Sequence, residues 1–529
     1  MNKFLKYFNT LKYLRFGQFY NRAVFKFYKP KIALNAEPVL NKNFKNLTDF
    51  PIKVISLLDG KNGQFRFLNE EHKVADKQDW NNSDINKLWL YNLHYFDYLQ
   101  QDGLDKETAN FWINKLIEDN SFPNGNGWEP YPISLRAVNW IKWALRGNEL
   151  SKEMQKSLFI QVRYLRKRLE YHLLANHLLA NAKALVFAGL FFDGAEAKEW
   201  FKKGLEIYAK ELPEQILKDG AHFELSTMYH AIILEDLLDL KNINAPIKNL
   251  DKYIPSMLTW LSAMIKTEDE ISLFNDAAQN IALTPKQLFE YADRLSIDYK
   301  KIQGSYDLKH SGYARLEKGP WLCLCDGAQI GPSYQTGHAH ADTLTFELWH
   351  NDKKIITNSG TKEYLWGQVR KYQRGSKAHN TIVIDDKNSS EIWHSHRTAN
   401  RAKIIERKFK EDCFLATHNG YKNCICKRIW QISDDKVIIE DSIKGQYDKA
   451  ELFFHFTPDT EVKILSENKA EIIKEGSKFL ITFNTENCNL TMQNTSISTQ
   501  FGLEISAPCL VLETRRKKKK YIITEIKTL

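Results

Sequence analysis

The long middle part of the chain has the hydrophobic pattern of amphipathic helices. From about residue 88 to residue 295, apolar side chains recur at three- and four-residue spacing, for example at 109–117 and 200–217. That spacing places apolar side chains on one face of an α-helix. The turn signals Asn124-Gly125-Asn126-Gly127, Asp193-Gly194, Asp219-Gly220 and Asn244-Ala245-Pro246 divide the region into segments of ordinary helix length. We therefore predict a domain of stacked helical hairpins.

Beyond Gly304 the pattern changes to short runs of β-branched and aromatic residues separated by Gly, Asn, Asp and Lys turns. Such runs predict antiparallel strands, and their continuation to the C-terminus predicts a β-sandwich. The clearest runs are Trp321 to Cys325, Thr343 to Trp349, Lys436 to Glu440, Ala450 to Phe456, Phe479 to Phe483 and Tyr521 to Ile526. The predicted fold class is thus α+β in two domains. Residues 1–50 form a basic, aromatic N-terminal segment, 51–300 the helical domain and 301–529 the β-sandwich.

The composition is that of a globular protein with an excess of basic residues. Of the 529 residues, 43% are hydrophobic and 26% charged, and the net charge of +10 favours a polyanionic partner. The sequence has no zinc-finger spacing, RNP-like strand or helix-turn-helix signature, so we expect no nucleic-acid partner. Seven cysteines, an odd number, exclude a complete disulfide framework.

The N-terminal residues alternate basic and aromatic side chains. Residues 1–27 contain no apolar stretch ending in a small-residue cleavage site, so no signal peptide is evident. No segment approaches the roughly 18–20 apolar residues of a membrane span, so we expect no transmembrane segment. We expect either a helix docked on the protein or a basic amphipathic segment that contacts an anionic membrane surface. The expected location is the cytoplasm or the periphery of the inner membrane, and the periplasm is the alternative location.

An unusual group of titratable residues lies at Gly337-His338-Ala339-His340-Ala341-Asp342, directly before a predicted strand. If this segment is extended, the two-residue period places His338, His340 and Asp342 on one face. Imidazoles and a carboxylate in one line suit proton transfer or metal binding. An exposed polar strand end is the alternative interpretation.

Three further segments place polar residues in apolar surroundings. Asp219 to His230 opens a predicted helix on which His222, Ser226 and Tyr229 share one stripe. The pair Asn176-His177 interrupts an otherwise apolar helix. The segment Trp128-Glu129-Pro130-Tyr131-Pro132, followed by Arg136, combines stacking surfaces with a permanent cation. Each segment by itself also fits a helix core with satisfied hydrogen bonds.

Taken together, these segments resemble the heparinase II/III-like family of polysaccharide lyases, from about Leu88 to the β-rich end. The motifs follow the family's order: Trp-Glu-Pro-Tyr-Pro at 128–132, Asn176-His177, Asp219-Gly220 through Tyr229-His230, His338-Ala339-His340, Ser359-Gly360-Thr361, and Arg374 to Asn380. The resemblance implies an incomplete α/α toroid followed by an antiparallel β-sandwich, with a substrate cleft where the two meet. It also implies cleavage of an acidic, uronic-acid-containing polysaccharide by β-elimination.

For that reaction, the resemblance implies that Asn176 neutralises the uronate carboxylate, with His177 beside it as a second donor. Tyr229 matches the family's catalytic tyrosine and His338 its catalytic histidine. We expect Tyr229 to protonate the leaving oxygen and either of the two to take the C5 proton. The residues expected to bind the substrate are Trp128, Tyr131, Arg136, His222, Glu224 and Arg374. An ordinary ion pair is the alternative for Arg374.

The resemblance also implies one structural divalent metal, often zinc, in the β-domain. The matching ligand positions are His340, Asn358 and His379, and the middle position usually carries Asp. Because a neutral amide is a weaker ligand than a carboxylate, a zinc site and a set of plain hydrogen bonds are both compatible with these residues.

Two other functions fit the same motifs. A uronate C5-epimerase removes the same proton but resolves the intermediate differently. A non-catalytic polysaccharide-binding or assembly factor of a capsule or O-antigen pathway would retain only the fold. The joint presence of Asn176, Tyr229 and His338 favours catalysis over binding.

Overall fold

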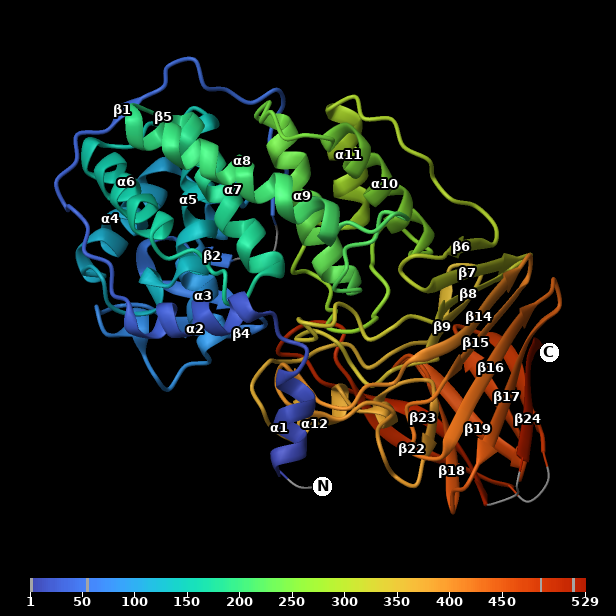
Figure 1. The fold of residues 1–529 in the computed structure, drawn as a ribbon. Helices are drawn as coiled ribbons and strands as arrows, with labels where there is room; N and C mark the ends of the chain where they lie inside the picture. Colours follow the sequence, from blue (N-terminus) through green and yellow to red (C-terminus); the bar gives the residue numbers. More distant parts are fainter. Residues whose placement is uncertain (1–2, 54–56, 486–487, 516–518) are drawn as a thin grey trace.

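The computed structural model describes residues 3–53, 57–485, 488–515 and 519–529, which form two adjoining domains (Figure 1). Helices make up the first domain, and antiparallel sheets make up most of the second. Within the described ranges, no helix has both the length and the apolar character needed to cross a membrane. The predicted fold class, a helical toroid followed by an antiparallel β-sandwich, is confirmed.

Paired helices surround the apolar core of the first domain. α7 (Ala175–Phe191) packs along α8 (Ala195–Gln215) and along α5 (Pro130–Leu145). Gly204 permits the close approach of α7 and α8, because a Cβ there would lie 2.6 Å from Val186 Cγ2. The other helices of this domain are α3 (Lys87–Tyr95), α4 (Lys106–Asp119), α6 (Lys152–Arg166), α9 (Thr227–Asn242), α10 (Leu250–Ala263) and α11 (Pro285–Arg294).

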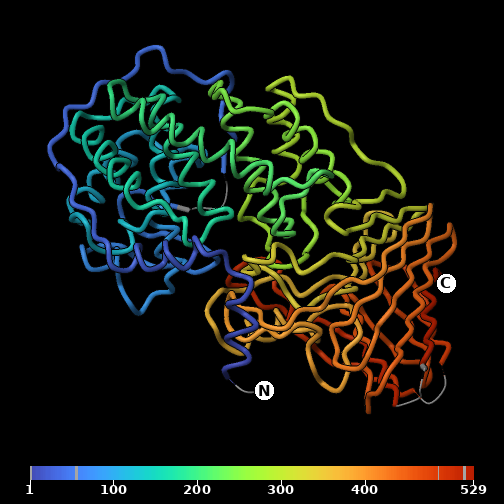
Figure 2. Tube along the Cα trace, in the orientation of Figure 1, coloured from blue at the N-terminus to red at the C-terminus, as the bar shows by residue number. Residues whose placement is uncertain are grey.

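The N-terminal segment lies outside that core. α1 (Lys3–Leu11) and α2 (Phe16–Phe27) precede an extended chain that runs around the outside of the helical domain (Figure 2). Tyr7 of α1 packs on Trp393 of the β-domain, with 5.3 Å between ring centroids. Phe25 of α2 stacks on His172 of the helical domain at 4.0 Å. The segment therefore bridges the two domains.

Short strands edge the helical domain. β1 (Val39–Leu40) pairs with β5 (Phe192–Asp193). The strands β2 (Leu57–Asp59), β3 (Gln64–Phe67) and β4 (Glu70–Lys73) form a small antiparallel sheet.

The second domain contains three larger antiparallel sheets. Their orders are β10-β9-β8-β7-β6, β11-β18-β23-β22 and β14-β15-β16-β17-β24-β21-β20-β19. Side chains alternate between buried and partly exposed along β16 and β17, as expected for strands with one face on a core. The first sheet comprises β6 (Tyr306–Leu308), β7 (Tyr313–Lys318), β8 (Trp321–Asp326), β9 (Phe346–His350) and β10 (Lys353–Ile356).

The second sheet comprises β11 (Ile382–Ile384), β18 (Lys449–His455), β22 (Cys488–Ile497) and β23 (Ile505–Arg515). The third comprises β14 (Ile404–Lys410), β15 (Cys413–His418), β16 (Cys424–Ile432), β17 (Lys436–Gly445), β19 (Thr460–Ser466), β20 (Lys469–Lys474), β21 (Ser477–Asn484) and β24 (Lys519–Thr528). A small hairpin of β12 (Ile392–His394) and β13 (Arg397–Thr398), and the short helix α12 (Gln368–Gln373), lie in the long connections.

An apolar cluster joins the two domains. Trp260 and Met264, from the end of α10, pack with Leu322 of β8 and Trp349 of β9. The Trp260 indole N–H also donates to Ser311 Oγ at 3.1 Å. This contact fixes the helical domain against the first sheet, and the loops of both domains meet beside it.

Candidate active site between the domains

A cavity of about 870 Å³ opens between the helical domain and the loops of the β-domain. Its volume lies in the range of ligand-binding clefts, about 300–1,000 Å³. Helices α3, α5, α7 and α9 supply one wall, and residues 334–338, Tyr364 and residues 394–401 supply the other. Among the lining side chains that can exchange protons or hydrogen bonds are Tyr131, Asn176, His177, Tyr229, His338, Tyr364 and His396.

Asn176 stands on the first turn of α7, where the backbone is unusual. Leu174 and Ala175 have φ values of 64° and 51°, a left-handed conformation that side chains with a Cβ seldom adopt and that surrounding contacts must enforce. The Asn176 amide donates to Glu224 Oε2 at 2.9 Å. Glu224 is buried, and burial raises the pKa of its carboxyl group. The turn and the carboxyl group together fix the amide on the cleft wall.

His177 follows on the same turn. Its Nδ1 lies 3.1 Å from Glu170 Oε1, and its ring centroid lies 4.5 Å from that of Tyr131. Burial opposes protonation of this imidazole, but the Glu170 carboxylate outweighs burial and raises the pKa of His177. The raised pKa favours the imidazolium form, and an imidazolium beside a neutral amide is a suitable receptor for a carboxylate.

Tyr229 lies on the first turn of α9. The Ser226 hydroxyl caps this helix by accepting from the Tyr229 backbone N–H at 3.2 Å. The phenol oxygen of Tyr229 is 3.0 Å from that of Tyr364, and its ring lies 3.9 Å from the His338 ring between centroids. Burial raises the pKa of the Tyr229 phenol well above its usual range. Tyr229 is therefore a neutral hydrogen-bond donor near neutral pH.

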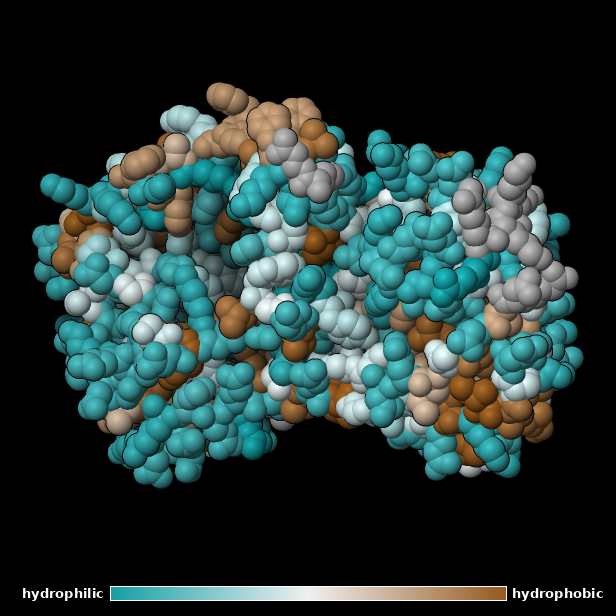
Figure 3. All heavy atoms as spheres, turned by 90° about the horizontal axis from the view of Figure 1, so that it is seen from below, coloured by the Kyte–Doolittle hydropathy of each residue, from teal (hydrophilic) through white to brown (hydrophobic). Residues whose placement is uncertain are grey.

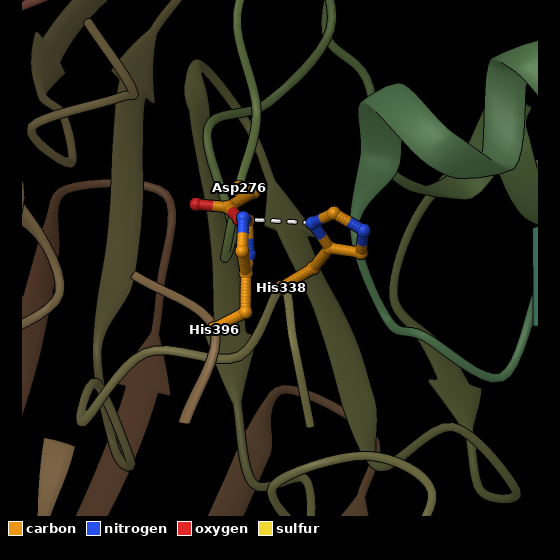
Figure 4. A group of neighbouring side chains, drawn as sticks. All are labelled: Asp276, His338 and His396. Carbon is orange, nitrogen blue, oxygen red and sulfur yellow. Dashed lines mark hydrogen bonds and ion pairs between the residues drawn. The ribbon is translucent and has the colours of Figure 1, made fainter. Parts of the chain in front are cut away.

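Asp276 orients His338. Its Oδ2 lies 2.9 Å from His338 Nδ1, and its backbone N–H donates to the His338 carbonyl at 3.0 Å. Figure 4 shows the second ring nitrogen of His338, Nε2, directed away from Asp276. An ionised carboxylate only accepts hydrogen bonds, so Nδ1 carries a proton, and in the neutral imidazole Nε2 is the nitrogen with a lone pair.

The Asp276 carboxylate is the centre of a buried polar cluster. Arg370 donates to both of its oxygens, at 2.8 Å to Oδ2, and His340 Nε2 lies 2.8 Å from Oδ1. Burial opposes ionisation of Asp276, but the Arg370 guanidinium outweighs burial and holds the pKa well below its usual range. Asp276 is therefore an anion that links the two histidines of the 338–340 segment.

The sequence did not reveal Asp276, Tyr364 or His396 as site residues. Asp276 lies between Asn275 and Ala277 in a segment without helical periodicity, a weak signal for a buried loop. The His396 ring lies 5.8 Å from that of His338. Asp276, His338 and His396 are close enough to share a metal ion. These three residues do not fit a cation site, because the Arg370 guanidinium already pairs with both oxygens of the Asp276 carboxylate.

His340 and His379 both have a ring nitrogen that is available as a ligand. His340 donates through Nε2 to Asp276, so Nδ1 keeps a lone pair, and Nδ1 is buried without a hydrogen-bond partner. His379 Nε2 lies 3.0 Å from the Gln373 carbonyl and must donate to it, so its Nδ1 also keeps a lone pair. Burial lowers the pKa of His340 to about 4 and that of His379 well below its usual range, so both rings are neutral.

Asn358 completes this group. Its Oδ1 lies 3.1 Å from His379 Nδ1 and accepts a hydrogen bond from Thr345 Oγ1 at 2.7 Å. With the amide in this orientation, two acceptors face each other beside the unpartnered Nδ1 of His340, and Asn358 Nδ2 is buried without a partner. With the amide turned, Nδ2 would donate to His379 Nδ1. Neutral imidazoles whose other nitrogen is held by a carboxylate or carbonyl are typical zinc ligands. His340, Asn358 and His379 fit a divalent metal.

The segment that carries His338 and His340 is not a strand, which corrects the prediction. Residues 337–345 form a loop, and β9 begins at Phe346. Backbone N–H groups in this loop bond to neighbouring loops: His340 N donates to Asn275 Oδ1 and Ala341 N to the Arg374 carbonyl. Asp342 is buried and does not line the cleft.

Two arginines predicted to bind substrate are structural. Arg136 is 1% exposed, and its guanidinium donates to Gln161 Oε1 and to the carbonyls of His94 and Gly127. Arg374 is fully buried and donates to the Ala339 carbonyl at 2.7 Å, and it forms no surface ion pair with any residue that the structure describes. Neither guanidinium can reach a glycan.

The other predicted substrate ligands are divided between the cleft and the interior. Tyr131 lines the cleft, whereas Trp128 does not and donates from its indole to the Asn120 carbonyl at 3.0 Å. His222 is 1% exposed. It precedes α9, which begins at Thr227, so it does not share a helical stripe with Tyr229 as predicted. Glu224 does not line the cleft but accepts hydrogen bonds from the Asn176 amide, which does.

Comparisons with known proteins agree with this architecture. Residues 152–281 match the model described as "Heparinase II/III N-terminus", and residues 303–524 match "Heparinase II/III-like, C-terminal". A heparin-sulfate lyase of Bacteroides stercoris is 26% identical over 321 residues, which are 54% of this chain and 46% of that protein. One of Bacteroides thetaiotaomicron is 24% identical over 421 residues, 68% of this chain and 58% of that protein.

The matched regions span about half the length of these relatives. A crystal structure of heparinase III aligns with a TM-score of 0.73 and 18% identity, and covers 97% of this chain and 90% of that one. A heparinase III structure described as the BT4657 gene product aligns with a TM-score of 0.62 and 18% identity, covering 97% of this chain and 89% of that one. At these identities the structural likeness supports the fold.

Proposed function

Because the chain belongs to the heparinase II/III-like family, we propose that it is a polysaccharide lyase that cleaves an acidic, uronic-acid-containing glycan by β-elimination. The observation that carries the proposal is the placement of four groups on one cleft. The rings of Tyr229 and His338 lie 3.9 Å apart between centroids, and Asn176 and His177 line the same cavity. Because the similar Bacteroides proteins are heparin-sulfate lyases, a glycosaminoglycan of that class is the first substrate to test.

The reaction begins with removal of the C5 proton of a uronate. That proton is weakly acidic while the neighbouring carboxylate keeps its full charge, so donors aimed at the carboxylate must stabilise the enolate-like intermediate. Asn176 supplies an amide N–H and His177 an imidazolium. Glu224 and Glu170 hold these side chains in place.

His338 is the proposed base and Tyr229 the proposed acid. His338 Nε2 takes the C5 proton, the C–H electron pair becomes the C4–C5 double bond, and the C4–O bond breaks as Tyr229 donates its proton to the leaving oxygen. The hydrogen bond from His338 Nδ1 to Asp276 supports the first role, because it selects the tautomer of the neutral ring in which Nε2 has the lone pair. Burial of the phenol supports the second role by keeping Tyr229 protonated.

We further propose that His340, Asn358 and His379 hold a structural zinc ion. When bound, the ion would tie the loop after His338 to the connection after α12. The three residues take no part in the proton transfers above.

Two variants test the lyase proposal. Tyr229→Phe and His338→Ala should each lower the rate of formation of unsaturated, ultraviolet-absorbing product from heparan sulfate by about 100-fold or more. Tyr253→Phe and His310→Ala are matched controls, because both residues lie outside the cleft. An epimerase would instead exchange the C5 hydrogen with solvent without forming unsaturated product. Bound glycan with neither reaction would indicate the non-catalytic alternative.

We also propose that the N-terminal segment contacts an anionic membrane surface. Residues 1–36 contain Lys or Arg at positions 3, 6, 12, 15, 22, 26, 29 and 31 and no Asp or Glu. Phe8, Phe16 and Phe27 are 55%, 84% and 75% exposed. Figure 3 shows apolar side chains gathered at the edge of the molecule where this segment lies. Exposed aromatic rings among lysines are typical of helices that lie in a lipid interface.

A further inference from the structure

Three arginines on the cleft wall have no carboxylate partner. Arg22, Arg397 and Arg401 all line the cavity, and among the described residues none of them forms an ion pair. The other basic side chains of the wall are neutralised. Lys53 pairs with Glu235 and Asp97, Lys142 with Asp239 and Glu235, Lys183 with Asp236 and Asp239, and Arg66 with Glu71.

Arg22 faces the cleft because α2 is anchored at both ends. At its start, Arg15 forms an ion pair with Glu214 of the helical domain. At its end, Arg168 donates to the Phe25 carbonyl at 2.7 Å and lies 3.7 Å over the Phe25 ring. Gln18, Arg22 and Phe25 have the spacing of one helix face, and this face lies against the body of the protein. The exposed phenylalanines occupy other positions.

Arg397 and Arg401 come from the β-domain, beside the reaction centre. Arg397 follows His396, whose ring lies 5.8 Å from that of His338. The Arg401 guanidinium lies 3.8 Å over the Tyr13 ring of the N-terminal segment and donates to the Ser333 carbonyl at 2.6 Å. The N-terminal segment and the β-domain thus contribute three cations to the lining of one cavity.

This arrangement has an electrostatic cost that a bound anion would offset. The Nε atoms of Arg22 and Arg401 are buried and have no hydrogen-bond partner. Burial, with a further contribution from the Arg397 charge, lowers the pKa of Arg22, and burial lowers that of Arg401 to about 10. Like charges that are partly removed from water destabilise a fold unless an opposite charge joins them.

We propose that Arg22, Arg397 and Arg401 form an anion subsite that binds an acidic group, a sulfate or a carboxylate, on a sugar next to the one that is cleaved. The planar guanidinium suits both groups, because each presents paired oxygens to its N–H donors. The identity of the ligand as a glycan rests on the proposed function. The subsite makes the N-terminal segment part of the substrate cleft.

Binding to a protein that does not turn over tests the subsite. In a Tyr229→Phe background, Arg22→Gln and Arg397→Gln should each raise the Kd for heparan sulfate oligosaccharides about tenfold, measured by titration calorimetry. An effect on heparan sulfate that is absent with unsulfated heparosan identifies the bound group as a sulfate. An equal effect on both glycans identifies it as a carboxylate.

Lys26→Gln and Lys403→Gln are matched controls, since each removes one positive charge near the same segments but outside the cavity. If the arginine variants bind as the controls do, or if the protein with all three arginines binds neither glycan, the subsite is overturned. The lyase proposal fails separately, if protein with Tyr229 intact forms no unsaturated product while binding stays dependent on Arg22 and Arg397.

Discussion

At the scale of single residues, Asp276 links the two histidines of the 338–340 segment to Arg370. It accepts from His338 and His340 and forms a two-point ion pair with Arg370. One carboxylate thereby sets the orientation of the proposed base and of a proposed metal ligand. Removing a charge that is buried in such a cluster leaves its partner unpaired, which costs more than the loss of one hydrogen bond.

Asp276→Asn should therefore affect both activity and stability. The kcat for unsaturated product should fall about 100-fold or more because Nδ1 of His338 loses its anionic acceptor. The unpaired Arg370 should lower the free energy of unfolding by about 3–5 kcal/mol. KM should change little, because Asp276 does not touch the substrate. Denaturant unfolding and steady-state kinetics measure these effects, and a raised KM with normal kcat would contradict the positioning role.

The proposed metal site gives a second prediction at this scale. His340→Ala should remove bound zinc, measured by elemental analysis of the purified protein, and should lower Tm. Asn358→Asp should retain the metal and bind it more tightly, since a carboxylate is the stronger ligand. The hydrogen-bonded alternative, in which the Asn358 amide is turned to donate to His379, predicts no stoichiometric zinc in the wild-type protein.

At the scale of helices, a buried ionic network ties the toroid together. Asp239 of α9 accepts from Lys142 of α5 and Lys183 of α7, and the Tyr291 hydroxyl of α11 donates to it at 3.0 Å. Asp239 is fully buried. Burial opposes its ionisation, but the two ammonium groups outweigh burial and lower the pKa of Asp239. The same helices carry Asn176 and Tyr229, so the network also maintains the cleft.

Asp239→Asn should lower the free energy of unfolding by about 3–5 kcal/mol because two buried ammonium groups lose their anion. Asp251→Asn is the matched control, since its pair with Lys241 is exposed and is worth about 0–1 kcal/mol. A carboxyl group whose pKa is lower in the folded than in the unfolded protein stabilises the fold at pH values above its unfolded pKa, which is about 4. The difference between wild type and Asp239→Asn should therefore shrink as the pH falls below about 4. A constant difference would exclude this linkage.

At the scale of the whole molecule, the N-terminal segment has two different surfaces. Its inner side bridges the domains and presents Arg22 to the cleft, whereas its outer side exposes aromatic and basic residues. An enzyme held at a membrane by this outer side would meet its glycan with the cleft beside the lipid surface.

Vesicle binding tests this interpretation. The protein should co-sediment with phosphatidylcholine vesicles that contain phosphatidylglycerol, and less with phosphatidylcholine alone. Replacing Phe8, Phe16 and Phe27 by Ser should weaken binding at least tenfold, because each buried ring contributes about 1.5–3 kcal/mol. The matched control replaces Leu465, Met492 and Ile523, which are exposed on the β-domain. Equal binding of both triple variants would contradict a role for the segment.

The sequence by itself determined the order of the two architectures and the residue types of the proposed reaction. Helical periodicity up to about residue 295 and alternating runs beyond Gly304 are local properties, so they could be read without the fold. The motifs with Asn176, Tyr229 and His338 predicted side chains that the fold indeed places on one cleft.

Tertiary structure decided which charged side chains line the cleft and which partners orient the groups proposed to react. Asp276 meets His338 across 62 positions and Tyr364 meets Tyr229 across 135, separations over which no local pattern carries information. Arg136 and Arg374 carry guanidinium groups that could bind an anion, but both are buried and donate to backbone carbonyls. Arg22 carries the same group and lines the cleft. Which arginines are structural and which line the cleft depends on burial and long-range hydrogen bonding, and therefore on the packing of the whole molecule.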